Sequence, residues 1–173
     1  MSKDAKYQIR KGVILAGGLG TRLFPATVSI SKQILPIYDK PMIYYALSTL
    51  MLSNIRDILI ISTKRDINIY KYLLNKGGEL GLNIEYKIQK RPNGIAEAFI
   101  IGKKFINNNP CALILGDNFF YGESFQKKLI YASKDMIHST VFSYYVHNPQ
   151  DYGVIECDNN NKVLKINEKP KKP

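Results

Sequence analysis

The sequence has no apolar run long enough to cross a bilayer and no apolar segment that would mark its N-terminus for export. Its longest apolar stretch, residues 42–52, is interrupted by tyrosine, serine and threonine and falls short of the ~20 residues that a membrane-spanning helix needs. Only a basic segment without a signal-like apolar core precedes Gly12. We therefore expect no membrane partner and a cytoplasmic location.

Cysteine is scarce as well. Cys111 and Cys157 are the two cysteines, and neither has the C-x-x-C or Cys/His neighbours that bind metals. Each lies in a run that is typical of a buried strand. We expect both thiols to be small buried apolar groups without a metal-binding or catalytic role.

Acidic residues are few, 14 against 25 lysines and arginines, so the net charge is +11. A charge of this size could indicate nucleic-acid binding. However, residues 1–11 and 162–173 together carry +7 of it, and basic chain ends are more often solvated tails. The distribution favours small anionic substrates over a nucleic-acid partner.

The order of apolar patterns predicts an α/β fold. Short β-rich runs at 12–16, 57–62, 84–88 and 112–115 alternate with helical patterns from Pro41, at 66–75, at 95–106 and near 125–133, and β-rich segments follow at 140–146, 152–157 and 163–166. Repeated strand-helix units predict a doubly wound, mostly parallel, Rossmann-like sheet, with ligands at the carboxyl ends of its strands. We expect a basic extension at 1–11, one core domain at 12–169 and a tail at 170–173.

A glycine-rich loop, Gly17-Gly18-Leu19-Gly20-Thr21-Arg22, follows the first predicted strand. Such a loop can take positive φ angles and present several backbone N–H groups to phosphates. Its spacing matches neither G-x-G-x-x-G nor the Walker A pattern. By itself the loop is therefore compatible with a structural turn.

The residues around this loop carry a resemblance to a known family. Leu15 to Leu23, with Pro25, Ser31-Lys32-Gln33, Leu35-Pro36 and Asp39-Lys40-Pro41, resemble the signature of nucleotidylyltransferases that join a nucleoside triphosphate to a sugar 1-phosphate. The resemblance implies that Arg22 and Lys32 are catalytic, because two fixed cations stabilise charge on the α-phosphorus and on departing pyrophosphate. It also implies a nucleotide-binding set: Leu15, Gly17, Gly18, Gly20, Thr21 and Gln33.

A second segment, Gln89 to Ala98, is similar to the part of the family that reads the base. The resemblance implies that Gln89, Pro92 and Gly94 bind the nucleotide, and a glutamine amide has both a donor and an acceptor for a uracil or thymine edge. An ordinary loop before a helix, with Glu97 supporting the first turn, is the alternative.

The remaining motifs are Leu115-Gly116-Asp117-Asn118, Tyr152-Gly153-Val154 and Glu168-Lys169-Pro170. The resemblance implies that Asp117 binds Mg²⁺ against the triphosphate. It also implies that the sugar 1-phosphate is bound by Asp117, Gly153, Glu168 and Lys169. Alternatively, Gly116-Asp117 is a turn and the lysines belong to an exposed tail.

Ser31-Lys32-Gln33 and the segment 38–45 look closer to members that transfer thymidylyl than to those that transfer uridylyl. The implied substrates are dTTP and glucose 1-phosphate, giving dTDP-glucose in the first step of dTDP-sugar (dTDP-rhamnose) synthesis. The alternative that this chain is a relative that uses UTP stays open.

Members of this family are longer and form homo-oligomers, and their C-terminal part adds sugar contacts and a second metal-binding aspartate. We therefore expect a core that is incomplete at its C-terminus. Two hypotheses stay open: an active enzyme, alone or with a complementary chain, and a nucleotide-binding remnant without turnover.

Overall fold

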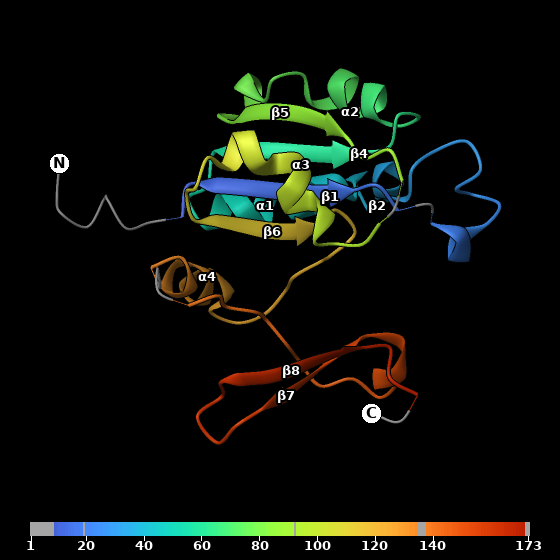
Figure 1. The fold of residues 1–173 in the computed structure, drawn as a ribbon. Coiled ribbons are helices and arrows are strands. Elements are labelled where there is room, and N and C mark those ends of the chain that lie inside the picture. Colours follow the sequence, from blue (N-terminus) through green and yellow to red (C-terminus); the bar gives the residue numbers. More distant parts are fainter. Residues whose placement is uncertain (1–8, 19, 92, 135–137, 172–173) are drawn as a thin grey trace, which may run out of the picture. The chain divides into compact units, whose positions relative to one another are not determined.

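The computed structural model describes residues 9–18, 20–91, 93–134 and 138–171 (Figure 1). The chain divides into two compact units, Met1–His138 and Ser139–Pro173. The expected division at residues 11 and 169 stays a prediction.

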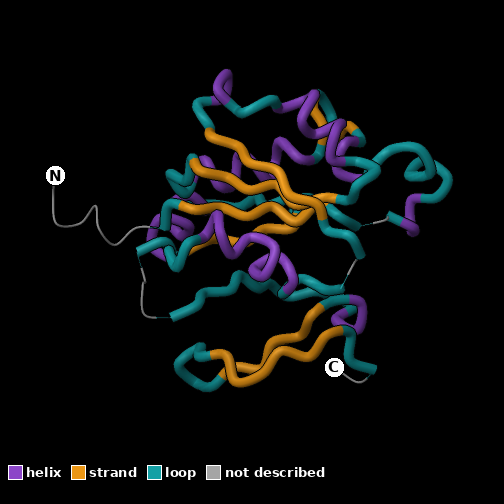
Figure 2. Tube along the Cα trace, turned by 45° about the horizontal axis from the view of Figure 1, so that its top comes forward, coloured by secondary structure: helices purple, strands orange, loops and turns teal. Residues whose placement is uncertain are grey.

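A four-stranded parallel sheet in the order β5-β4-β1-β6 forms the centre of the first unit (Figures 1 and 2). In its middle, β1 (Lys11–Ala16) and β4 (Asp57–Ser62) lie side by side. The outer strands are β5 (Asn83–Ile88), next to β4, and β6 (Cys111–Leu115), next to β1. The middle strands are apolar almost throughout because both faces of a parallel sheet are covered. The predicted α/β architecture is confirmed.

Helices cover both faces of this sheet. On one face, Ile14, Ile58 and Ile60 pack with residues of α1 (Ile43–Leu52) and α2 (Ile67–Leu74). On the other, Val13, Leu59 and Ile61 pack with α3 (Glu97–Ile106), which lies in front of the sheet in Figure 1. Successive strand side chains point to opposite faces, and burial of each large aliphatic one contributes about 1.5–3 kcal/mol. The apolar runs therefore build two cores.

The fourth helix, α4 (Phe125–Ala132), contacts α1. In the part of the chain that the structure describes, no helix combines the length and the apolar character that a membrane span requires.

Two helices begin later than the sequence pattern predicts. Pro41 does not open α1: it pairs with Pro36 in a short antiparallel ladder of β2 (Pro36–Ile37) and β3 (Lys40–Pro41), and the helix begins at Ile43. Similarly, α3 begins at Glu97 rather than Ile95, after Gly94 has turned the backbone with a φ of 97°.

The second unit contains an antiparallel hairpin of β7 (Gly153–Cys157) and β8 (Val163–Glu168), preceded by the 3-10 turn Pro149–Asp151. The strand expected at 140–146 is wrong, because these residues contain no strand. Composition makes a segment suitable for a sheet, but a strand also needs a neighbouring backbone to pair with.

The expectation of buried thiols is also wrong for Cys157, which is exposed at the end of β7. A two-stranded hairpin has no second layer within its own unit to cover both faces. Cys111 begins the outer strand β6 and is half-buried, and burial raises the pKa of its thiol.

Candidate active site

The carboxyl edge of the parallel sheet collects the three motifs of the first unit. Gly17 follows β1, Gln89 follows β5, and Asp117 lies two residues beyond β6. Because the strands are parallel, all three leave the sheet at the same edge. Residues separated by up to 100 positions are thereby placed around one loop.

The glycine loop leaves β1 through buried Gly17 and exposed Gly18, and Leu19 lies outside the described residues. Gly20 has a φ of 63°, and a Cβ there would lie 2.9 Å from the side chain of Thr27. The Thr27 hydroxyl donates to the Gly20 carbonyl at 2.8 Å. A side chain at position 20 would be strained by both its backbone and its neighbour. The loop therefore requires glycine here.

The two side chains predicted to be catalytic, Arg22 and Lys32, lie on two separate 3-10 turns. Thr21 and Arg22 belong to Thr21–Leu23, and both are exposed. Lys32 begins the turn Lys32–Ile34, and its Nζ lies 3.1 Å from Oδ2 of Asp117, with each side chain 31% exposed. An ion pair this exposed is worth at most about 1 kcal/mol. Both partners can therefore exchange it for a charged ligand at low cost.

Close backbone packing places Asp117 beside the loop. The preceding Gly116 donates its N–H to the Leu15 carbonyl at 2.9 Å. A Cβ on Gly116 would lie 3.1 Å from both Ala16 Cβ and Gln33 Cγ. The end of β6 is thus packed tightly against the end of β1, which holds the Asp117 carboxylate at the site.

Gln89 is buried against the loop from the side of β5, with 5% of its surface exposed. Its Nε2 donates to Oε2 of Glu97 at 2.7 Å, and Asn93 Nδ2 donates to the other carboxylate oxygen at 3.1 Å. The Oε1 atom of Gln89 approaches Gly17 so closely that a Cβ on Gly17 would lie 2.6 Å from it. Gly94 is exposed at the turn before α3, and Pro92 lies outside the described residues.

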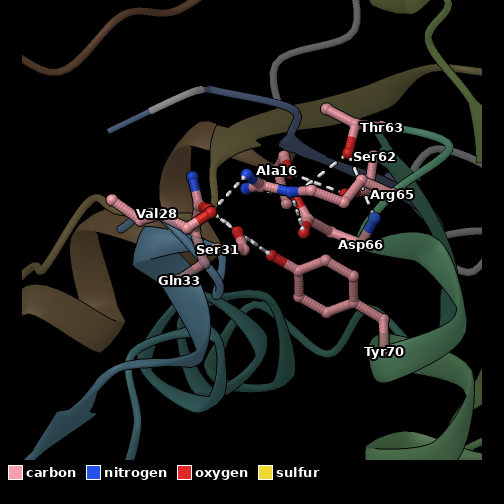
Figure 3. Close-up of polar contacts among 9 residues, drawn as sticks. All are labelled: Ala16, Val28, Ser31, Gln33, Ser62, Thr63, Arg65, Asp66 and Tyr70. Atoms are coloured by element: carbon pink, nitrogen blue, oxygen red, sulfur yellow. Dashed lines mark hydrogen bonds and ion pairs between the residues drawn. The ribbon is translucent and has the colours of Figure 1, made fainter. Parts of the chain in front are cut away.

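Gln33 approaches the same loop from within a buried hydroxyl network, which Figure 3 shows. Ser31 Oγ donates to Gln33 Oε1 at 2.5 Å and lies 2.8 Å from the Tyr70 hydroxyl. With its single proton given to Gln33, Ser31 accepts from Tyr70, whose hydroxyl also lies 3.4 Å from Gln33 Oε1 and donates to it. The Gln33 nitrogen lies 4.0 Å from the position of a Cβ on Gly18. Burial raises the pKa of Tyr70 to about 12, so this hydroxyl keeps its proton.

A second set of contacts in Figure 3 attaches the start of α2 to the chain after the glycine loop. Asp66 is 1% exposed and accepts from Thr63 Oγ1 at 3.0 Å and from Arg65 Nε at 2.7 Å. Arg65 also donates to the Val28 carbonyl at 3.3 Å. These bonds satisfy the buried carboxylate and tie the loop to the helix that carries Tyr70.

The hairpin of the second unit carries the remaining residues that are predicted to bind the sugar 1-phosphate. Gly153 lies opposite Glu168 in the β7–β8 register, and a Cβ on Gly153 would lie 3.4 Å from Oε2 of Glu168. Lys169 follows with a φ of 45° and donates its N–H to the Tyr152 carbonyl at 2.9 Å. Three of the four residues predicted to bind the sugar 1-phosphate, Gly153, Glu168 and Lys169, are thus exposed on this one hairpin, whereas Asp117 belongs to the first unit.

Asp117 is the predicted metal ligand. Over the ranges that the structure describes, no three His, Cys, Asp or Glu side chains gather into a group that could hold an ion. A Mg²⁺ ion bound with a polyphosphate needs only one or two carboxylates, because waters and phosphate oxygens complete its octahedron. A partly exposed carboxylate beside Lys32 fits an ion shared with a nucleotide rather than an all-protein cage.

Sequence reasoning missed two members of the site. Tyr70 belongs to the apolar face of a predicted helix, and nothing local distinguishes it from other core tyrosines. Glu97 was interpreted only as support for a helix turn, although its carboxylate binds Gln89. The pairing of Glu97 with Gln89 at a spacing of eight could have been found by asking which group anchors a buried amide.

Comparison with known proteins identifies the family of this chain. The sequence model described as nucleotidyl transferase matches residues 11–173. The chain belongs to this family. The resemblance inferred from the motifs is confirmed.

Several curated relatives of this nucleotidyl transferase are named glucose-1-phosphate thymidylyltransferase. The protein from Neisseria meningitidis is 52% identical over 163 residues, which cover 94% of this chain and 57% of the relative. The one from Xanthomonas campestris pv. campestris is 51% identical over 164 residues, covering 95% and 56%. The chain thus spans just over half the length of the curated relatives it matches.

Solved structures share the fold. A Bacillus anthracis protein described as a glucose-1-phosphate thymidylyltransferase, in complex with a sucrose, superposes with a TM-score of 0.87 at 35% identity, covering 95% of this chain and 66% of that one. A UDP-glucose pyrophosphorylase complexed with UDP-glucose has a TM-score of 0.75 at 24% identity, covering 94% and 69%. At that identity the second likeness concerns the fold alone.

Proposed function

We propose that this nucleotidyl transferase uses dTTP and glucose 1-phosphate to form dTDP-glucose and pyrophosphate, the first step of dTDP-sugar (dTDP-rhamnose) synthesis. The observation that carries the proposal is the 3.1 Å pair of Lys32 and Asp117 at the glycine loop. The pair brings together a cation and an anion from two distant motifs. A metal-bound triphosphate at the glycine loop would need both, the lysine for its phosphates and the aspartate for its metal ion. The names of the curated relatives support the choice of substrates.

The proposed reaction is a single in-line displacement. A phosphate oxygen of glucose 1-phosphate attacks the α-phosphorus of dTTP. The bond from that phosphorus to the oxygen leading to the β-phosphorus breaks, and pyrophosphate leaves with the electron pair. Because the attacking oxygen is already anionic, no protein nucleophile or general base is required. The chain then contributes placement and charge neutralisation.

The glycine loop and the two cations would hold the triphosphate. Backbone N–H groups of Gly18, Gly20 and Thr21 suit phosphate oxygens, and Leu15 and Gln33 border the same loop. Arg22, exposed on its turn, and Lys32 would neutralise the charge that builds on the leaving group. Gln89 and Gly94, with Pro92, would contact the base.

Asp117 would hold Mg²⁺ together with the phosphates, and such an ion supplies neutralisation of phosphate oxygens and alignment for the attack. When the nucleotide and its ion bind, Lys32 would exchange its ion pair with Asp117 for one with the phosphates. In the second unit, Gly153, Glu168 and Lys169 would bind the sugar 1-phosphate, the carboxylate accepting from sugar hydroxyls and the lysine facing the phosphate. The cytoplasmic location belongs to the same proposal.

Pyrophosphate release from dTTP, glucose 1-phosphate and Mg²⁺ tests this function. We expect Lys32→Ala to lower kcat/KM by about 100-fold or more, the usual effect of removing a group that stabilises transition-state charge. UTP in place of dTTP measures the base preference in the same assay. Isothermal titration with dTTP records binding separately from turnover.

The Lys11–Asp57 pair offers a matched control. It is also 3.1 Å long and partly exposed, but it joins the amino ends of β1 and β4, at the edge of the sheet away from the glycine loop. Lys11→Ala should leave turnover within about twofold, because a lost surface pair costs little stability. Binding of dTTP without any pyrophosphate release would instead identify a nucleotide-binding chain without turnover. Binding that Lys32→Ala does not weaken would contradict the proposed site.

A further inference from the structure

The two ends of the Gln89 amide have different neighbours. Nε2 donates to Glu97 Oε2 at 2.7 Å. Oε1 is the atom next to the glycine loop, 2.6 Å from the position of a Cβ on Gly17. With 5% of the residue exposed, little water can reach the amide. Its orientation therefore depends on the protein groups around it.

A carboxylate can bind a glutamine amide in only one orientation. An ionised carboxylate accepts hydrogen bonds and donates none, so the nitrogen end must face Glu97. An inverted amide would place its oxygen against a carboxylate oxygen, which loses a charge-assisted bond and adds repulsion. The bonds from Gln89 and then Asn93 hold the pKa of Glu97 below its ordinary value, so the carboxylate stays ionised at neutral pH.

The second oxygen of Glu97 is held as well. Asn93 Nδ2 donates to Oε1 at 3.1 Å from the loop that precedes α3. Glu97 is itself the first residue of α3, so the carboxylate is anchored by both its helix and the loop. The restraint on Gln89 therefore comes from a carboxylate whose two oxygens are both hydrogen-bonded.

We propose that Glu97 is a positioning residue that directs the Gln89 carbonyl oxygen toward the glycine loop and thereby selects bases that offer a ring N–H. The proposal rests on the proposed function, in which Gln89 reads the base. Thymine and uracil carry a proton on N3 that this oxygen can accept. Cytosine has an unprotonated N3, so two acceptors would face each other. The site therefore discriminates dTTP and UTP from dCTP.

Titration calorimetry with dTTP and dCTP tests the proposal. In the unmodified chain we expect dCTP to bind roughly 100-fold more weakly, because a site built to pair with one hydrogen-bonding group rejects an analogue that lacks it. Glu97→Leu frees the amide to invert and should reduce that ratio to about tenfold or less. Glu97→Gln offers the Gln89 amide both a donor and an acceptor, so it no longer fixes one orientation and should lower the ratio as well.

Controls separate this inference from the proposed function. Glu85→Leu makes the same chemical change on the exposed side of β5 and should leave the ratio unchanged. Gln89→Ala should weaken dTTP binding. If it does so while Glu97→Leu keeps the full discrimination, the role of Glu97 is wrong and the proposed base contact stands. If Gln89→Ala leaves dTTP binding unchanged, both are wrong.

A measurement without nucleotide tests the restraint itself. In ¹⁵N-correlated NMR spectra the Gln89 side-chain NH₂ signals, assigned by their loss in Gln89→Ala, should be protected from solvent exchange. Glu97→Leu should remove that protection, and Glu97→Ala serves if the leucine variant does not fold. Unchanged protection in both variants would overturn the proposal.

Discussion

Gln33 and Gln89 approach the same glycine pair, but opposite ends of their amides are anchored. At Gln33 the oxygen is held by the Ser31 hydroxyl, and the nitrogen is the end near Gly18. At Gln89 the nitrogen is held by the Glu97 carboxylate, and the oxygen is the end near Gly17. The loop thus has a donor on one side and an acceptor on the other.

The anchors also differ in kind. A carboxylate defines the orientation of Gln89 by itself, because it can only accept. Hydroxyls can both donate and accept, so the orientation of Gln33 depends on the whole chain from Tyr70 through Ser31. One side of the loop relies on a single charged group and the other on a cooperative buried network. The first should be sensitive to local crowding and the second to loss of any member.

Crowding at Gly17 should produce the largest effect. In Gly17→Ala the new Cβ would lie 2.6 Å from Gln89 Oε1, so the amide must leave its place beside the loop. We expect dTTP affinity to fall about 100-fold, and unfolding free energy to fall by about 1–2 kcal/mol because the displaced amide loses its bond to Glu97. Titration calorimetry and thermal melting measure the two quantities.

Gly18→Ala is the matched comparison on the Gln33 side. Its Cβ would lie 4.0 Å from Gln33 Nε2, an ordinary contact, so the loss of affinity should be smaller, under about tenfold. In the double variant Gly17→Ala/Gln89→Ala the two losses should not add, because both act on one group. Equal losses at positions 17 and 18 would show that displacement of Gln89 is not the cause.

Removal of the Tyr70 hydroxyl should have a moderate effect on stability. Tyr70→Phe leaves Ser31 without its donor in a buried site, which should cost about 1–2 kcal/mol of unfolding free energy in urea titrations. Tyr72, on the same helix and 92% exposed, provides the control, and Tyr72→Phe should change stability by less than about 0.5 kcal/mol. Equal losses of unfolding free energy in the two variants would show that the Tyr70 hydroxyl does not support Gln33.

The smallest effect concerns alkaline pH. Burial raises the pKa of Tyr70 and of Tyr86 to about 12 from the ordinary tyrosine value of 10.0. Above pH 10 the unfolded chain loses these protons while the folded chain keeps them, so stability falls as pH rises from 10 toward 12. Below pH 10 both states are protonated and no dependence is expected from these groups.

Melting curves between pH 9 and pH 11.5, with tyrosinate absorbance recorded in parallel, would measure this dependence. Tyr70→Phe should make the alkaline decline shallower, and Tyr72→Phe should not. A Tyr70 that ionises together with the exposed tyrosines would contradict its burial in the network.

Much of the first unit could be predicted because its signals are local. The apolar run at 57–62 matches β4, and the run beginning at Gly12 differs from β1 by one residue. Such runs are readable because a strand buried on both faces must be apolar throughout. The glycine requirement at position 20 is also local, since a positive φ there reflects backbone sterics.

The failures concern pairing and packing partners, which the composition of a segment does not specify. Residues 140–146 have the composition of a strand but no strand forms there, and Cys157 is exposed at the end of a strand. Pro41 is a suitable first residue for a helix, yet it pairs with Pro36 instead. In each case the outcome depends on which backbone or layer is close enough to pair or pack, and no local pattern records it.

By itself, the sequence determined the parallel α/β core, the glycine loop and the family to which the chain belongs, because these depend on short-range sterics and on contiguous motifs. Only the tertiary structure decided that Lys32 meets Asp117, that Glu97 orients Gln89 and that Tyr70 supports Gln33. Those contacts arise where parallel strands end at a common edge. The direction in which a buried amide points is settled by the donors and acceptors that the fold brings to it.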